Sequence, residues 1–175
     1  MENSLSQPQS TKVAIVKKRL LIVDDDPYVL DGYRRLFRSQ RDRWEVTFCN
    51  SGADALEQLR QHPFDVLVTD MQMPGMNGAE LMAQAVEVAP GVARIVLTGY
   101  ASMTSSVEAS DFAHQLLNKP CDLDSLREAI DHSCQIQSMI SSDRVKQAIG
   151  RVGRLPSPST VYQKLNRALE KDTTD

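Results

Sequence analysis

The sequence predicts an α/β protein built on a five-stranded parallel sheet, and three observations support this fold class. Five short apolar runs alternate with amphipathic stretches of helical period along the 175 residues. The central run, Val66-Leu67-Val68-Thr69, is rich in β-branched residues, which is typical of a strand covered on both faces. That run ends in a carboxylate, Asp70, followed by a Pro-Gly turn. The alternation predicts helices on both faces of the sheet, joined to it by right-handed crossovers.

The composition is that of an ordinary soluble globular protein. The length suits one full domain plus a fragment. With 41% hydrophobic residues, 25% charged residues and a formal net charge of −3, we expect affinity for neither nucleic acid nor membranes. No apolar run approaches the roughly 20 residues of a membrane span, and Met1–Gln9 does not resemble a signal peptide, so we expect a cytoplasmic protein. Cys49, Cys121 and Cys134 lack metal-ligand or redox spacing and are expected to be reduced.

The first half of the chain is expected to hold three strands and two helices after a disordered tail at residues 1–17. Leu20–Val23 is a buried strand, and the acids and proline that follow it suit a helix start. Apolar residues at helical spacing predict a helix over Tyr28–Ser39. Alternation predicts a strand over Trp44–Cys49, and a proline ends the helix predicted over Ser51–His62. The third strand is Val66–Asp70.

The second half continues the alternation. Gly78–Ala89 has inward apolar residues of helical period and is ended by Pro-Gly, before a buried strand at Ala93–Leu97. Ser102–Ser110 is rich in serine and has few apolar anchors, so we expect a lightly packed helix. His114–Asn118 is a short strand, and Asp122–Ile140 is a helix with leucine and isoleucine inward.

Five polar residues are expected to meet at one edge of this sheet. Asp24 and Asp25 follow the first strand, Asp70 ends the third, Thr98 follows the fourth and Lys119 follows the fifth. Ligands of such sheets sit outside the carboxyl ends of the strands. Three carboxylates that repel each other need a cation, and hard oxygen ligands suit Mg²⁺. An aspartate beside Mg²⁺ and a lysine can attack a phosphoryl group, and a threonine hydroxyl can then bind the new phosphoryl oxygen.

These motifs resemble the receiver domain of bacterial response regulators over about Arg19 to Ser133. The matching residues are Asp24-Asp25, Asp70 with Met73-Pro74-Gly75-Met76-Asn77-Gly78, Thr98-Gly99 and Lys119-Pro120. The resemblance implies the flavodoxin-like (βα)5 receiver fold with strand order 2-1-3-4-5 and a cis peptide between Lys119 and Pro120.

The resemblance also implies the roles of individual residues. Asp70 would be the phosphoacceptor, assisted by Lys119 and Thr98. Mg²⁺ would be held by Asp70, by Asp25 directly, by Asp24 through water and by the backbone carbonyl of Gln72. The phosphoryl group would come from a histidine kinase or a histidine phosphotransfer protein. Only phosphorylation and dephosphorylation of the chain itself are expected, with no external substrate.

Other polar or sulfur-containing residues have ordinary structural explanations. Asp26 precedes Pro27 and is expected to be a solvated acid at a helix start rather than a metal ligand. The three histidines have no partner at ligand or triad spacing and are expected to be surface or half-buried residues: His62, His114 and His132. The loop methionines are expected to pack rather than bind metal: Met71, Met73 and Met76.

Two residues depart from the family pattern. Leu116 stands where many receivers have an aromatic residue that changes rotamer, and Cys121 stands where an aromatic residue often follows the cis-proline. We therefore do not expect an aromatic switch, and we expect lighter packing under the last helix. Our hypothesis is that phosphorylation orders Ser102–Ser110 through Thr98.

The chain beyond the receiver, which we bound at residues 18–135, is expected to form a helical linker at 136–152. Its apolar residues could pair with a second copy. Residues 153–175 resemble the opening of the HDOD output domain, a helical signalling module, although Pro158 and Ser159 depart from that pattern. Because the chain stops at Asp175, we expect it to be a piece of a longer protein.

Two classes of function stay open, and a third is disfavoured. The first is a receiver that biases its own C-terminal output domain. The second is a stand-alone phosphoryl sink or interaction adaptor with a helical dimerisation tail. A metal-dependent phosphatase would share the acids, but we identify neither a substrate pocket nor an acid for its leaving group in the sequence.

Overall fold

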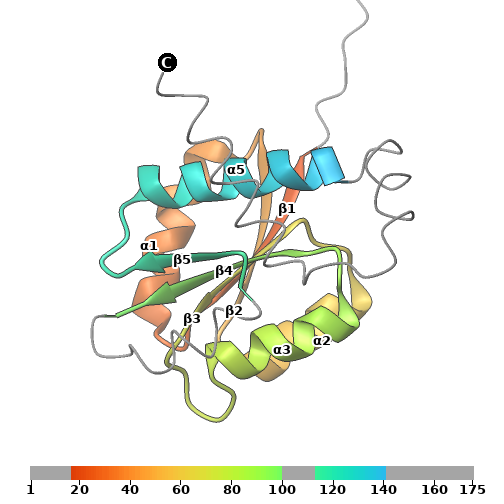
Figure 1. Cartoon of the computed structure of the whole chain (residues 1–175). Helices are drawn as coiled ribbons and strands as arrows, with labels where there is room; N and C mark the ends of the chain where they lie inside the picture. The colour runs from red at the N-terminus through yellow and green to blue at the C-terminus, as the bar shows by residue number, and fades with distance from the viewer. Residues whose placement is uncertain (1–16, 100–112, 141–175) are drawn as a thin grey trace, which may run out of the picture.

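The computed structural model describes residues 17–99 and 113–140, and within them it has the predicted five-stranded parallel sheet, in the order β2-β1-β3-β4-β5 (Figure 1). The strands are β1 (Lys18–Val23), β2 (Trp44–Cys49), β3 (Val66–Asp70), β4 (Ala93–Thr98) and β5 (Gln115–Asn118). The helices are α1 (Pro27–Phe37), α2 (Gly52–Gln61), α3 (Gly78–Val88) and α5 (Leu123–Ile140), with a short 3-10 helix at Arg38–Gln40. Every pair of neighbouring strands is parallel.

The helices form a layer on each face of the sheet (Figure 1). Helices α1 and α5 cover one face, and α2 and α3 cover the other. Successive residues of a strand point to opposite faces, so Leu20 and Ile22 join the α1/α5 core while Leu21 and Val23 join the α2/α3 core. Both faces of β1, β3 and β4 are therefore buried, which explains why these strands are apolar almost throughout.

Side chains at the helix starts explain where the helices begin. Asp26 caps α1 by accepting a hydrogen bond from the backbone N–H of Tyr28, with Pro27 as the first helical residue. The prediction that Asp26 is a helix-start acid is thus confirmed. Ser51 caps α2, and Asn77 forms a reciprocal capping box with Glu80 at the start of α3. Predicted and observed ends of elements differ by one or two residues, because terminal turns are the least constrained by packing.

One prediction about the histidines is wrong. His62 is exposed and His132 is half-buried, as expected, but His114 is only 5% exposed. Its Nδ1 accepts a hydrogen bond from the backbone N–H of Arg94 at 2.9 Å, and its Nε2 lies 3.1 Å from Nη2 of Arg94. Arg94 is itself 1% exposed and donates to the carbonyl of Val92. The partner comes from the neighbouring strand rather than from a nearby position in sequence, so residue spacing could not reveal it.

Several other expectations can be compared with the structure. The cis peptide between Lys119 and Pro120 is present. The loop methionines pack as predicted: Met71 and Met73 belong to the α2/α3 core, and Met76 packs against it. All three cysteines are unpaired. None of the helices in the described ranges combines the length and apolar character that crossing a membrane requires.

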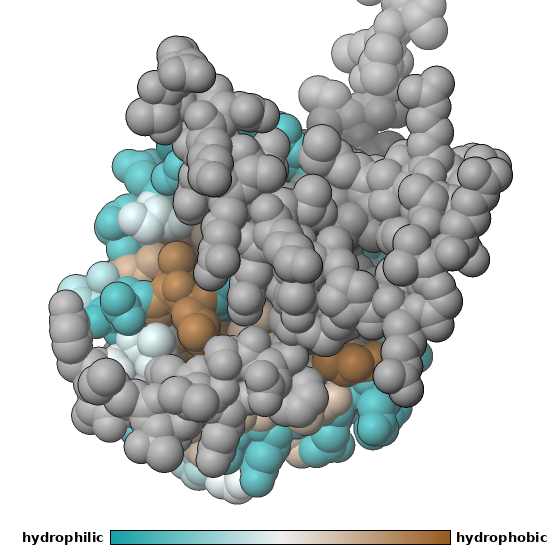
Figure 2. Space-filling model, viewed as in Figure 1, coloured by the Kyte–Doolittle hydropathy of each residue, from teal (hydrophilic) through white to brown (hydrophobic). Residues whose placement is uncertain are grey.

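Some predictions fall outside the described residues. These are the disordered tail up to residue 16, the helix at 102–110, the linker beyond residue 140 and the resemblance to an output domain at 153–175. Leu116, at the position where an aromatic switch residue would stand, is 40% exposed on β5. Figure 2 shows a hydrophobic patch on this face of the molecule, where Figure 1 draws β5.

Candidate functional site

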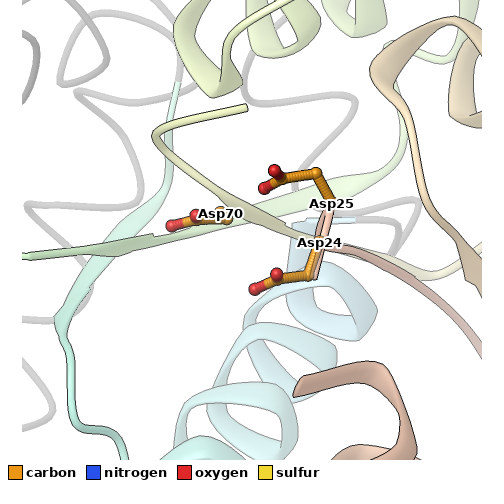
Figure 3. A group of neighbouring side chains, drawn as sticks. All are labelled: Asp24, Asp25 and Asp70. Carbon is orange, nitrogen blue, oxygen red and sulfur yellow. The ribbon is translucent and has the colours of Figure 1, made fainter. Parts of the chain in front are cut away.

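Three carboxylates converge at the carboxyl edge of the sheet (Figure 3). Strands β1 and β3 are neighbours, and Val23 pairs with Thr69, so the next residue of each strand, Asp24 and Asp70, lies at the same level. Asp25 follows Asp24, and the three side chains point to the same side. Each offers an oxygen within 4.8 Å of the other two. The predicted convergence of these acids is therefore observed.

Asp24 is the most deeply buried acid of the group, at 1% exposed. Its Oδ1 accepts a hydrogen bond from the backbone N–H of Asp26 at 3.0 Å. Its Oδ2 lies 2.9 Å from the Nζ of Lys119. Both oxygens of Asp24 are thus engaged by the protein, which fits the need of a buried carboxylate for hydrogen-bonding partners.

Asp70 has one engaged oxygen and one available oxygen. Its Oδ1 accepts a hydrogen bond from the backbone N–H of Met71 at 2.8 Å and lies 3.0 Å from the Nζ of Lys119. In the part of the chain that the structure describes, Oδ2 has no hydrogen bond or ion pair. The side chain is fixed through Oδ1, so Oδ2 is the oxygen best placed to react with a group outside the protein.

Lys119 connects the two buried acids. It follows β5, and its backbone N–H donates to the carbonyl of Thr98 at 2.7 Å, which fixes the start of the side chain beside β4. Burial by itself would lower the pKa of Lys119, but its hydrogen bonds to Asp24 and Asp70 outweigh that effect, and the pKa lies above its usual value. The ammonium therefore stays charged at neutral pH and holds the two carboxylates together.

Thr98 lies at the same edge of the sheet, as predicted. It is the last residue of β4, directly after Leu97, which pairs with Asp70. Its side chain is buried, and its hydroxyl donates to the carbonyl of Gly99 at 3.3 Å. A hydroxyl held this way can turn toward a new acceptor, because a serine or threonine hydroxyl hydrogen rotates freely about its bond.

The loop between β3 and α3 is held against Asp70 by its glycines. Gly75 has a φ of 76°, a left-handed conformation that favours glycine. The backbone N–H of Gly78 donates to the carbonyl of Met71 at 2.9 Å. A Cβ on Gly78 would collide with the backbone carbonyl of Asp70 and the Cα of Met71. The sequence motif contains Gly78, but only the structure shows that this glycine permits the loop to return to Asp70.

The donor set fits a hard divalent cation. The candidate ligand atoms of Asp24, Asp25 and Asp70 are all carboxylate oxygens, with no nitrogen or sulfur among them. Oxygen-only sites with an exposed side that can keep water suit Mg²⁺. Asp25 is exposed, whereas the other two are buried, so the site opens toward solvent on the side of Asp25. Gln72 lies in the loop two residues after Asp70 with an exposed side chain, and the role of its backbone carbonyl as a ligand stays a prediction.

Residues 20–131 match the family model of the response regulator receiver domain, and the chain belongs to this family. The matched residues form a receiver domain of the kind found in two-component response regulators. Response regulators of such systems interact with histidine kinases, and receiver domains generally bind Mg²⁺ at an acidic pocket.

Known proteins similar to this chain include long regulators and short receiver proteins. It is 33% identical over 133 residues to the transcriptional regulatory protein GlrR of Escherichia coli (strain K12), covering 74% of this chain and 29% of GlrR. It is 34% identical over 117 residues to the response regulator receiver protein CpdR of Brucella abortus (strain 2308), covering 65% of this chain and 94% of CpdR. The chain thus spans less than a third of GlrR but nearly all of CpdR.

The fold is also similar to solved structures. One is the crystal structure of a CheY-like response regulator receiver domain protein from Methanospirillum hungatei JF-1. The TM-score is 0.66, at 30% sequence identity, covering 71% of this chain and 98% of that chain.

Proposed function

We propose that this chain is a phosphoacceptor: Asp70 takes a phosphoryl group from a histidine kinase or a histidine phosphotransfer protein. The observation that carries the proposal is the position of the Lys119 ammonium, 2.9 Å from Asp24 and 3.0 Å from Asp70. This arrangement places a fixed positive charge beside a carboxylate that still has a free oxygen. It is the setting that phosphoryl transfer to an aspartate requires.

The chemical step follows from the two oxygens of Asp70. Oδ2 attacks the phosphorus of a phosphohistidine; the new P–O bond forms as the P–N bond breaks, and the histidine nitrogen leaves with the bonding electron pair. Met71 and Lys119 hold Oδ1 and so fix the direction of attack. The Lys119 ammonium offsets negative charge beside the transferring group. When bound, Mg²⁺ would offset charge on the phosphoryl oxygens, held by Asp24, Asp25, Asp70 and the backbone carbonyl of Gln72.

The response to phosphorylation would begin at Thr98. Its buried hydroxyl, now bound to Gly99, can hydrogen-bond a phosphoryl oxygen on Asp70 and draw the end of β4 toward the site. Leu116 carries no ring that could follow this movement. We therefore retain the hypothesis that residues 102–110 become ordered; equal amide exchange there with and without a phosphoryl mimic would contradict it.

The output would lie C-terminal to the receiver. On this proposal residues 18–135 are the receiver domain, 136–152 a helical linker and 153–175 the start of an HDOD-type output domain, in a cytoplasmic protein. The last receiver helix and linker could also form a homodimer. The fact that the chain covers only 29% of GlrR supports a further domain.

A second candidate is a stand-alone phosphoryl sink or adaptor. The observation that favours it is the match to CpdR, 94% of which is covered, because that relative is little longer than a receiver. The two candidates share the same chemistry at Asp70 and differ only in what the helical extension does.

The test of the shared chemistry is incubation with a small phosphodonor such as acetyl phosphate and Mg²⁺, followed by intact mass and peptide mapping. We expect one phosphoryl adduct, located on Asp70, lost in Asp70→Asn and lost from the wild type when EDTA is added first. Asp42→Asn is the matched control, because Asp42 is an exposed acid in the turn before β2, away from the carboxyl edge. An adduct of unchanged yield in Asp70→Asn would refute the proposal.

A further inference from the structure

A second charged feature lies away from the acidic site, on the outer side of α1. A groove of about 310 Å³ runs between α1 and the edge strand β2. Its walls include three arginines, Arg34, Arg38 and Arg41, and three aromatic residues, Phe37, Trp44 and Phe48. Among the described residues that line it, none is acidic. The groove therefore combines positive charge with an apolar floor.

The positive charge of the groove is only partly neutralised. Arg34 pairs with Asp31 at 2.7 Å, and its guanidinium lies 5.0 Å from the centre of the Phe48 ring. Arg38 and Arg41 are exposed and form no ion pair within the described ranges. The chain as a whole carries a formal net charge of −3, whereas the local charge of this groove is positive.

The floor of the groove is packed into the core between α1 and the sheet. Trp44 is buried, and its ring lies 5.3 Å from that of Phe37, which joins β2 to the end of α1. The 3-10 helix at Arg38–Gln40 follows α1 directly and carries Arg38 at the rim. A ligand would thus meet a surface that is already formed, with little ordering cost for the protein.

The groove runs along a strand edge that can accept another strand. In the described sheet β2 is the outermost strand and pairs only with β1. The backbone groups on its outer edge are therefore open to pairing with an extended peptide, which is a common mode of peptide recognition. Carboxylates on alternate residues of such a peptide would point toward α1, where the arginines lie.

We infer that this groove binds an extended acidic segment of a partner protein, which pairs with the edge of β2 and places carboxylates on Arg38 and Arg41. Charge complementarity identifies the partner as acidic. The C-terminal 35 residues of the chain hold seven basic and four acidic residues, which disfavours them as the occupant. The strand edge favours a peptide over a nucleic acid, because a phosphodiester backbone cannot continue the ladder of amide hydrogen bonds.

The test measures binding of a fluorescein-labelled octapeptide of alternating glutamate and valine to the full chain by fluorescence anisotropy. We expect saturable binding, and a dissociation constant about tenfold higher for Arg38→Gln/Arg41→Gln, since two charge-assisted contacts are lost. The charge-matched control is Arg35→Gln/Arg60→Gln: both arginines are exposed, and neither lines the groove. Because all four side chains lie at the surface, both double variants are expected to fold.

Two further measurements separate the proposal from other occupants. Amide resonances of β2, residues 44–49, should shift on titration while those of β5 do not. An oligothymidylate of the same net charge should bind at least about tenfold more weakly than the acidic peptide. Equal binding of the acidic peptide and the oligothymidylate would overturn the inference. Equal loss of peptide affinity in the two double variants would do the same. So would a dimer of the unliganded chain that is dissociated by Arg38→Gln/Arg41→Gln and not by the control variant, because the groove would then bind a second copy of the chain. Asp70 plays no part in these readouts, so they do not depend on its phosphorylation.

Discussion

Asp25→Asn should make the Mg²⁺-free protein more stable. Asp25 lies within 4.8 Å of Asp24 and Asp70, but within the described ranges the ion pairs of Lys119 are with those two acids and not with Asp25. Two unit charges at that distance repel by about 0.9 kcal/mol at the dielectric constant of water. Asp25 has two such neighbours, and attraction to the Lys119 ammonium offsets part of their effect. We therefore expect the free energy of unfolding to rise by about 1 kcal/mol in the variant.

The assay is urea denaturation in EDTA and again in Mg²⁺. A ligand that binds only the folded state stabilises it according to its concentration and affinity. Mg²⁺ should therefore stabilise the wild type more than Asp25→Asn, which lacks one carboxylate ligand. The difference in free energy of unfolding between the two proteins should therefore shrink or change sign as Mg²⁺ is added. In EDTA, the same difference should become smaller at high salt, because exposed charges are screened.

Asp42→Asn serves as the control, since Asp42 is exposed and lies outside the acidic group. Its stability should stay within about 0.5 kcal/mol of the wild type, and its response to Mg²⁺ should be unchanged. The reasoning is refuted if Asp25→Asn is no more stable than the wild type in EDTA, or if the two proteins gain equally from Mg²⁺.

Two further predictions concern the packing around the site and the buried histidine. Gly78→Ala should destabilise the fold by about 2 kcal/mol, because its Cβ would collide with the Asp70 carbonyl, whereas Gly32→Ala, which meets no neighbour within 4 Å on α1, should be neutral or stabilising; equal urea midpoints would contradict this. Burial, and then the charge of Arg94, lower the pKa of His114 to about 3 from 6.5, so between these pH values the unfolded chain binds a proton that the folded chain does not. The free energy of unfolding should therefore fall as the pH drops from 6.5 toward 3, and it should fall less steeply in His114→Gln. If the free energies of unfolding of the wild type and His114→Gln change in parallel with pH, the lowered pKa of His114 is disproved.

The sequence was sufficient to predict the sheet and the edge at which the acids meet. Apolar strands such as Val66–Asp70 reveal themselves because both of their faces are buried, and the position of each acid follows from where its strand ends. The strand order is different in kind: it came from the resemblance to receivers, because local patterns do not say which strands pair.

The parts that could not be predicted depend on contacts between residues distant in sequence. Arg94 lies in a strand that is otherwise apolar up to its last residue, Thr98, and nothing in this local pattern shows that His114, directly before β5, would meet it. The ion pair that engages Oδ2 of Asp24 comes from Lys119, which follows β5 and lies far from Asp24 in sequence. Only the fold could establish that Oδ2 of Asp70 stays available.

The two layers of the fold each contain one buried thiol. Cys49 belongs to the α2/α3 core and Cys134 to the α1/α5 core, on opposite faces of the sheet. Burial raises the pKa of both thiols to about 11, so each reacts with an alkylating reagent chiefly when its own layer opens. Labelling rates resolved by mass spectrometry would therefore report the opening of each layer separately. Each face of the sheet thus has its own cysteine reporter of local opening, with no engineered label required.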